Sequence, residues 1–198
     1  MSDFLEPILA ESQHFSWLET IAVLTALIYV YFASKGNRVC FFFGLISSAI
    51  YIYIATDLKY YFDSLINAYY VIMSVYGWFS WKSSRLSELE VKSMPKSQFG
   101  ILILTGITIS LFLGFASYKL TDAQLPFWDA ITTVFSLIAT WLVVKKVLQN
   151  WLIWIVVDFI AMIMYYEKGL LLTSLLFLIY TIIAIRGYFI WRKEIKVA

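Results

Sequence analysis

The sequence predicts an all-α integral membrane protein with seven transmembrane helices, and its composition and hydropathy pattern support this prediction. Of its 198 residues, 62% are hydrophobic and 14% are charged, whereas soluble domains average about 45–50% and 25%. The mean hydropathy is +0.80. The apolar residues form runs of about 20, the length that crosses ~30 Å of hydrocarbon as a helix. No break between runs can hold a soluble domain, so we expect one membrane domain over residues 1–198.

Seven segments have this length and apolar character, and short polar breaks separate them. The longest break, Lys82 to Ser97, is polar and rich in serine, which predicts a flexible connector. The predicted spans cover residues 17–34, 39–56, 61–81, 99–118, 126–144, 150–166 and 170–191.

Lys and Arg are distributed unequally between alternate loops. Eleven lie in the first, third and fifth loops and the C-terminal tail, against three in the N-terminal segment and the other loops. Cytoplasmic loops of membrane proteins carry the excess of Lys and Arg. The distribution therefore predicts an N-terminus outside the cell and a C-terminus in the cytoplasm.

The chain resembles itself when it is shifted by 110 residues. Gly77 then falls on Gly187, and Trp81 falls on Trp191. This match predicts two three-helix repeats, residues 17–81 and 126–191, joined by a linker helix at 99–118. The linker helix restores the direction of the second repeat, which gives the 3+1+3 parallel arrangement found in transporters. A duplicated structural membrane protein is the alternative.

Several chemistries are absent from the sequence. With one cysteine, Cys40, and one histidine, His14, no metal or haem centre is expected, and we predict no cofactor. The chain has no phosphate-binding G-x-x-x-x-G-K-[ST] loop and no G-x-S-x-G nucleophile motif. Its basic residues are spread over loops, so no nucleic-acid partner is expected. A transporter is the first prediction, a channel or sensor the second, and a membrane enzyme the third.

Asp158 lies about eight residues inside the sixth span, close to the middle of the bilayer. A carboxylate there costs free energy unless it faces water or a partner, so an intramembrane Asp is a candidate functional residue. Trp151 and Trp154 share its helix face. Two indoles and a carboxylate suit a flat aromatic cation. Alternatively, Asp158 forms a structural pair with Arg186, and Trp151 is an interfacial anchor.

The third and seventh spans carry similar polar and aromatic stripes. Asn67, Tyr70 and Ser74 follow one another at helical spacing on the third span, and Tyr180 occupies the position equivalent to Tyr70. These side chains are deep enough to reach a central site. We predict that they contribute to substrate binding.

Three motifs resemble the PnuC-type vitamin transporters, which include a nicotinamide riboside transporter and related thiamine carriers. The motifs are residues 76–81, 126–129 and 150–154. The resemblance covers nearly the whole chain. It implies a SWEET-like fold, a bacterial inner-membrane location in contact with lipid, a homotrimer, and facilitated diffusion of a vitamin that a cytoplasmic kinase traps. It also implies that Trp151 and Trp154 form ring walls of the substrate site, and we include Asn150 from the same motif.

Three positions differ from the nicotinamide riboside pattern of that family. Asp158, Ser74 and Arg186 stand where Asn is expected. Amides suit a ribose and a carboxamide, whereas a carboxylate suits the aminopyrimidine and the positive thiazolium of thiamine. The sequence therefore favours thiamine as the substrate, with nicotinamide riboside as the alternative.

Overall fold

The computed structural model describes residues 17–57, 61–81, 90–122 and 125–195. Within these ranges helices are the only extended regular elements, apart from one isolated β-bridge between Lys92 and Val147. The helices are α2 (Trp17–Ser34), α3 (Cys40–Asp57), α4 (Tyr61–Ser80), α5 (Lys96–Leu120), α6 (Pro126–Val144), α7 (Asn150–Glu167) and α8 (Leu171–Lys193).

Six of these helices are long and apolar enough to cross a membrane, and α4 is the exception among the described residues. The polar side chains of α4 have a structural reason, because Asp63, Asn67 and Ser74 all face a central cavity. A helix that lines a cavity needs less apolar surface than one surrounded by lipid. The all-helical membrane fold is thus confirmed, while a seventh span at residues 61–81 stays a prediction.

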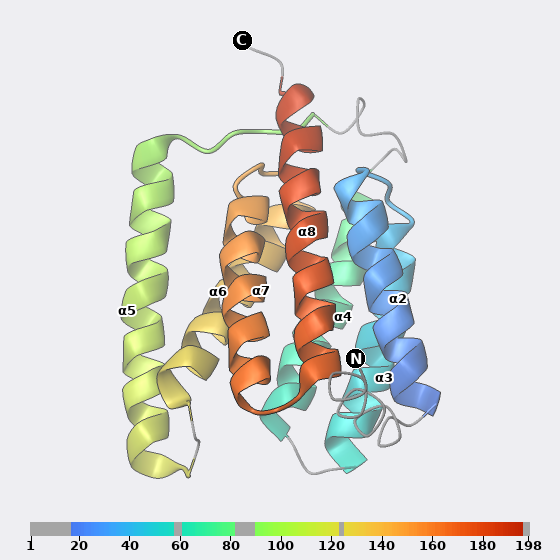
Figure 1. The fold of residues 1–198 in the computed structure, drawn as a ribbon. Helices are drawn as coiled ribbons and strands as arrows, with labels where there is room; N and C mark the ends of the chain where they lie inside the picture. The colour runs from blue at the N-terminus through green and yellow to red at the C-terminus, as the bar shows by residue number, and fades with distance from the viewer. Residues whose placement is uncertain (1–16, 58–60, 82–89, 123–124, 196–198) are drawn as a thin grey trace, which may run out of the picture.

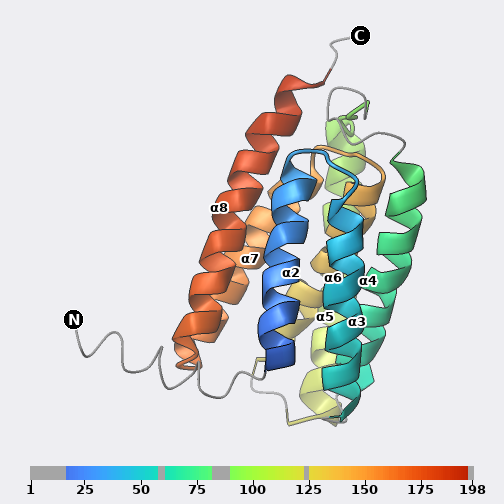
Figure 2. The same ribbon diagram turned by 90° about the vertical axis from the view of Figure 1, so that its right-hand side faces the viewer.

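Six helices form a closed ring, and the seventh lies outside it. The helix α2 packs against α3 and α8, α4 packs against α3 and α6, and α7 packs against α6 and α8. Figures 1 and 2 show these helices running side by side, with α5 set apart next to α6. We call α2, α3 and α4 the first wall and α6, α7 and α8 the second wall.

Glycines allow α5 to approach α6 closely. A Cβ atom at Gly106 would lie 2.8 Å from the ring of Phe135, and one at Gly114 would lie 2.6 Å from the ring of Phe127. Aromatic rings of α6 therefore occupy the space that larger side chains on α5 would fill. Small residues at helix contacts are the usual means of close packing in membranes, where no hydrophobic effect drives helices together.

Within each wall, the first two helices are joined by a turn of the same geometry. Gly36 N–H donates to Ala33 O at 2.9 Å, and Lys146 N–H donates to Val143 O at 2.9 Å. Gly36 and Lys146 have positive φ angles of 63° and 61°. Glycine adopts this conformation without cost, whereas lysine is strained in it.

The connector between the walls is ordered where it is described, in contrast to the flexible connector predicted for Lys82 to Ser97. Lys92 N–H donates to Lys146 O, and Leu148 N–H donates to Lys92 O. The Gln149 side chain bonds both backbone groups of Met94. These bonds, together with the buried side chain of Val91, fix the segment onto the α6–α7 turn. Residues 82–89 lie outside the described part of the chain.

Candidate functional site

A cavity of about 1160 Å³ occupies the centre of the helix ring. All six helices of the two walls line it, and α5 does not. At one end its lining includes exposed residues, among them Asp63, Gly169 and Leu170, so the cavity reaches the surface there. At the other end it stops at buried apolar and aromatic side chains beside the α2–α3 and α6–α7 turns.

Seven of the eight residues predicted to bind substrate line this cavity. They are Asn67, Tyr70, Ser74, Trp151, Trp154, Asp158 and Tyr180. The eighth, Asn150, does not line it. Its side chain is fully buried in the first turn of α7, and its amide nitrogen donates to Val147 O at 2.7 Å. The placement of Asn150 reflects its role at the end of a helix.

The Asp158 carboxylate faces the cavity and is only 5% exposed. It lies close enough to the hydroxyl groups of Tyr70 and Tyr180 to interact with them electrostatically. Within the described residues it has no hydrogen bond or ion pair of its own. Burying an unpaired carboxylate is costly, and water or a cationic ligand in the cavity would stabilise its charged form.

Arg186 does not reach this carboxylate. Its side chain is exposed on α8 and is absent from the cavity lining. It interacts instead with Tyr31 on the neighbouring helix α2. The geometry among described residues therefore gives no support to the structural pair of Asp158 and Arg186.

The two tryptophans of α7 meet the cavity at different depths. Trp151 lies at the closed end, where its indole is 2% exposed and packs edge-on against Trp191 with ring centroids 5.5 Å apart. Trp154 is one turn further along α7, is half-buried, and lies on the same side of the helix as Asp158. Trp154 is therefore the indole better placed to stack on a ligand held by Asp158.

Tyr70 and Tyr180 contribute polar groups from α4 and α8. The Tyr70 hydroxyl lies near the Ser136 side chain. Asn67 also lines the cavity, and its amide nitrogen donates to Asp63 O at 2.9 Å. Polar side chains from α4, α6 and α8 thus line the same cavity as the carboxylate.

The cavity has further polar and aromatic lining that the sequence alone did not identify. The additional polar residues share short side chains or acidic groups, and the additional aromatic residues come from four helices. They are Glu19, Ser47, Ser48, Asp63, Ser136, Thr140 and Thr173, and Tyr29, Phe41, Tyr51, Tyr165 and Phe177. The internal match at a shift of 110 residues could have identified part of this lining, because it makes Ser48 equivalent to Asp158.

All the charged side chains in the described lining of the cavity are acidic. Glu19, Asp63 and Asp158 are acidic, and none of the described residues that line the cavity is Lys, Arg or His. The described residues also contain no group of three His, Cys, Asp or Glu side chains able to hold a metal ion. The cavity can therefore hold a cation against carboxylates and rings, and it lacks a counter-ion for phosphate.

The chain is similar to known transporters along most of its length. A family model described as nicotinamide mononucleotide transporter matches residues 16–193. The nicotinamide riboside transporter PnuC of Escherichia coli (strain K12) is 26% identical over 212 residues, which cover 93% of this chain and 89% of the relative. The Neisseria mucosa protein of the same name is 25% identical over 196 residues, which cover 91% of this chain and 74% of the relative.

A solved structure has the same fold. The crystal structure of the vitamin B3 transporter PnuC superposes with a TM-score of 0.73 and covers 96% of this chain and 86% of that chain. The two sequences are 22% identical in this comparison.

Proposed function

Because the chain belongs to the nicotinamide mononucleotide transporter family, we propose that it carries nicotinamide riboside across the membrane by facilitated diffusion. The membership confirms the family resemblance found in the sequence, and the homologues are transporters, not enzymes. The observation that carries the proposal is the cavity, in which Asp158 and Trp154 lie among hydroxyl groups and no basic side chain lines the described surface.

The chemistry of the lining fits each part of nicotinamide riboside. The pyridinium ring is flat and positive, so it can stack on an indole and lie near a carboxylate. The ribose has several hydroxyl groups, which need donors and acceptors once they leave water. Short hydroxyl side chains are available on both walls. They are Ser47, Ser48, Ser74, Ser136 and Thr140.

The same lining disfavours the mononucleotide in the family's name. A phosphate monoester carries about −1.5 to −2 charges at pH 7. Proteins bind phosphate with Arg, Lys or helix N-termini. The described lining instead contains Glu19, Asp63 and Asp158, which would repel the phosphate.

Thiamine is the second candidate, and Asp158 is the observation that favours it. Thiamine is also a flat cation, and its aminopyrimidine can donate hydrogen bonds to a carboxylate. It has a single hydroxyl group, however, so it would leave most of the hydroxyl lining without partners. The named relatives are nicotinamide riboside transporters, which adds weight to the first candidate over the thiamine prediction.

Competition in proteoliposomes tests the substrate. Uptake of radiolabelled nicotinamide riboside is measured with an excess of unlabelled nicotinamide riboside, thiamine, riboflavin or nicotinamide mononucleotide. We expect strong inhibition by nicotinamide riboside and little by the mononucleotide. Saturable uptake of thiamine that nicotinamide riboside fails to inhibit would reverse the order of the two candidates.

The transport mode is tested in the same vesicles. The chain has no phosphate-binding loop, and a cation can enter down its own gradient. We expect the free substrate inside to reach the outside concentration and stop there. Concentration well above that level, abolished by a sodium or proton ionophore, would contradict facilitated diffusion.

The proposal includes seven spans in two parallel repeats around the linker helix, with a SWEET-like arrangement. Support comes from the cavity, where eleven positions of the first wall have an equivalent lining residue exactly one shift of 110 residues further on. The pairs are Ala26/Ser136, Val30/Thr140, Ala33/Val143, Phe41/Trp151, Gly44/Trp154, Ser48/Asp158, Ala55/Tyr165, Asp63/Thr173, Asn67/Phe177, Tyr70/Tyr180 and Ser74/Ala184.

The excess of Lys and Arg in alternate loops supports an outside N-terminus and a cytoplasmic C-terminus. With that orientation, the open end of the cavity faces outward. Labelling of terminal tags on intact cells tests it, and a C-terminal tag reached without permeabilisation would refute it. The homotrimer and the trapping kinase remain part of the proposal, and native mass spectrometry of the purified protein measures the oligomer directly.

A further inference from the structure

Four aromatic side chains close one end of the cavity. Phe41 and Trp151 line the cavity there, and Trp81 and Trp191 pack behind them. Trp81 and Trp191 are 0% exposed, and their ring centroids are 5.7 Å apart. Each also contacts a cavity ring edge-on, since the Phe41 and Trp81 centroids are 4.8 Å apart and the Trp151 and Trp191 centroids 5.5 Å. We call these four residues the aromatic layer.

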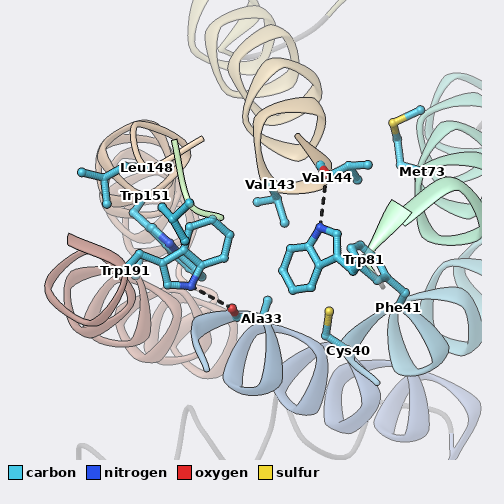
Figure 3. Packing of buried hydrophobic residues seen from close by; sticks show 12 residues of the cluster. Ala33, Cys40, Phe41, Met73, Trp81, Val143, Val144, Leu148, Trp151 and Trp191 are labelled. Carbon is cyan, nitrogen blue, oxygen red and sulfur yellow. Dashed lines mark hydrogen bonds between the residues drawn. The ribbon is translucent and has the colours of Figure 1, made fainter. Parts of the chain in front are cut away.

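Two hydrogen bonds in the aromatic layer join the walls. The Trp81 indole N–H, from the first wall, donates to Val144 O in the second wall at 3.2 Å. The Trp191 indole N–H, from the second wall, donates to Ala33 O in the first wall at 3.2 Å. Figure 3 shows both bonds among the buried side chains. The walls are thus bonded to each other at both of their contacts, by donors that occupy equivalent positions in the two walls.

Glycines make room for the rings of the aromatic layer. A Cβ atom at Gly187 would lie 2.8 Å from the Trp151 indole, and one at Gly77 would overlap the Phe41 ring. The layer therefore forms only if α4 and α8 both have glycine at these positions. The same requirement in both helices indicates a specific packing contact.

The aromatic layer contains a buried polar atom without a hydrogen-bond partner among the described residues, the indole nitrogen Nε1 of Trp151. A buried polar group without a hydrogen bond loses its water and gains nothing in return. This nitrogen would regain water if the layer separated. It therefore destabilises the closed layer relative to an open one.

We propose that the aromatic layer is a gate, held shut by the indole bonds of Trp81 and Trp191, and that the unpaired Nε1 of Trp151 favours its opening. The indole bonds stabilise the closed state and the unpaired nitrogen destabilises it, so the two effects oppose each other in the equilibrium between closed and open states. The inference goes beyond the proposed function and holds for any transported vitamin.

The native cysteine offers a direct test. Cys40 belongs to the same buried cluster and is fully buried, so thiol reagents reach it only when the cluster opens. The rate of Cys40 alkylation by N-ethylmaleimide is measured by mass spectrometry on the purified full chain. No transported ligand is needed, so failure here is distinct from failure of the proposed function.

Three variants separate the two parts of the inference. Trp81→Phe and Trp191→Phe keep a ring and remove the donor, and each should speed alkylation roughly fivefold, the worth of one net hydrogen bond. Trp151→Phe keeps a ring and removes the unpaired Nε1, and it should slow alkylation by about the same factor. Trp128→Phe, at an exposed indole in the first turn of α6 and at the opposite end of that helix from Val144, is the matched control and should leave the rate unchanged.

Each variant has a result that would contradict the proposal. Wild-type rates in folded Trp81→Phe and Trp191→Phe would overturn the gate, and a faster or unchanged rate in Trp151→Phe would overturn the role of the unpaired nitrogen. If a tryptophan variant fails to fold, Gly187→Ala provides the same measurement by crowding Trp151, and again an unchanged rate overturns the gate. An impermeant thiol reagent applied to vesicles should reach Cys40 only from the side of the α2–α3 turn. Equal labelling from both sides would indicate general loosening and would also overturn the gate.

Discussion

The two walls of the cavity have the same helix arrangement but differ in the residues at equivalent positions. Where the second wall has Asp158, the first wall has Ser48, and where the second has Trp154, the first has Gly44. A Cβ atom at Gly44 would lie 2.9 Å from the Tyr29 ring, so the first wall fills this space with a ring from α2. At these two equivalent positions the second wall therefore supplies a carboxylate and an indole, and the first wall supplies a hydroxyl group and a tyrosine ring.

The walls also differ at their turns. The α6–α7 turn is bound by the connector through Lys92 and Gln149, and no described residue binds the α2–α3 turn in this way. If the gate opens, movement of the α6–α7 turn would break more hydrogen bonds than movement of the α2–α3 turn. The comparison suggests that the second wall is the fixed, ligand-holding side and that the first wall is the side that moves. Four predictions test how far this difference extends, in order of decreasing effect.

Removing the charge of Asp158 should have the largest effect on binding. Asp158→Asn keeps the shape and removes a charge-assisted interaction of about 1.5–3 kcal/mol, which corresponds to roughly ten- to a hundredfold in affinity. Calorimetry on monodisperse protein with nicotinamide riboside and with thiamine measures the change.

The equivalent substitution, Ser48→Ala, should weaken binding much less, because a neutral hydrogen bond contributes about 0.5–1.5 kcal/mol. Arg186→Gln is the control for a structural pair and should leave affinity unchanged. Unchanged affinity in Asp158→Asn would remove this carboxylate from the site and erase the difference between the walls there.

Adding a methyl group to the glycines beneath the gate should reduce stability in both walls. Overpacking typically costs about 1–3 kcal/mol. Gly77→Ala should cost more than Gly187→Ala, because the Phe41 ring lies closer to Gly77 than the Trp151 ring does to Gly187. Thermal unfolding in detergent measures the order, with Gly100→Ala as the control, since nothing lies within 4 Å of a Cβ there. The reverse order would show that the two walls do not pack at the gate as described.

Removing the Trp154 indole should weaken binding of any flat cation. A cation–π contact contributes about 0.5–2 kcal/mol, so Trp154→Ala should reduce affinity by up to roughly thirtyfold. Both vitamins should lose affinity by similar factors, because stacking does not distinguish a pyridinium from a thiazolium. A loss confined to one vitamin would show that the indole takes part in selectivity, which the comparison of the walls does not predict.

The smallest effect is expected at the turns. Lys146 holds a φ of 61° in the position where the first wall has Gly36. Lys146→Gly relieves this backbone strain, but glycine also gives the unfolded chain more conformational entropy. The net gain in the free energy of unfolding is up to about 1 kcal/mol. The melting temperature should rise slightly, and Gly36→Ala should lower it. A fall in Lys146→Gly would indicate that the lysine side chain stabilises the turn more than its backbone strains it.

The helices and many of the cavity residues could be predicted from the sequence. Runs of about 20 apolar residues define spans because an unpaired backbone is too costly in lipid. Helical spacing placed Trp154 and Asp158 on one face, and an intramembrane carboxylate has few alternatives to a cavity. The shift of 110 residues aligned the two walls in advance of any coordinates.

Which helix faces contact each other could be learned only from the folded structure. Within one helix, spacing fixes which side chains share a face, but it does not say what that face contacts. Asn150 and Trp151 are neighbours in one motif, yet one is buried at a helix end and the other lines the cavity. Arg186 is exposed and lies beside Gly187, which packs on Trp151, whereas Tyr180 is the residue of α8 that lies near Asp158.

The closed end of the cavity is the clearest case. Trp81 and Trp191 look like interfacial residues in the sequence, because each ends a helix next to a basic residue. In the structure both are fully buried and bond the opposite wall. Those bonds join residues 63 and 158 positions apart in the chain. No local pattern encodes such a separation, so only the packing of the two walls could reveal it.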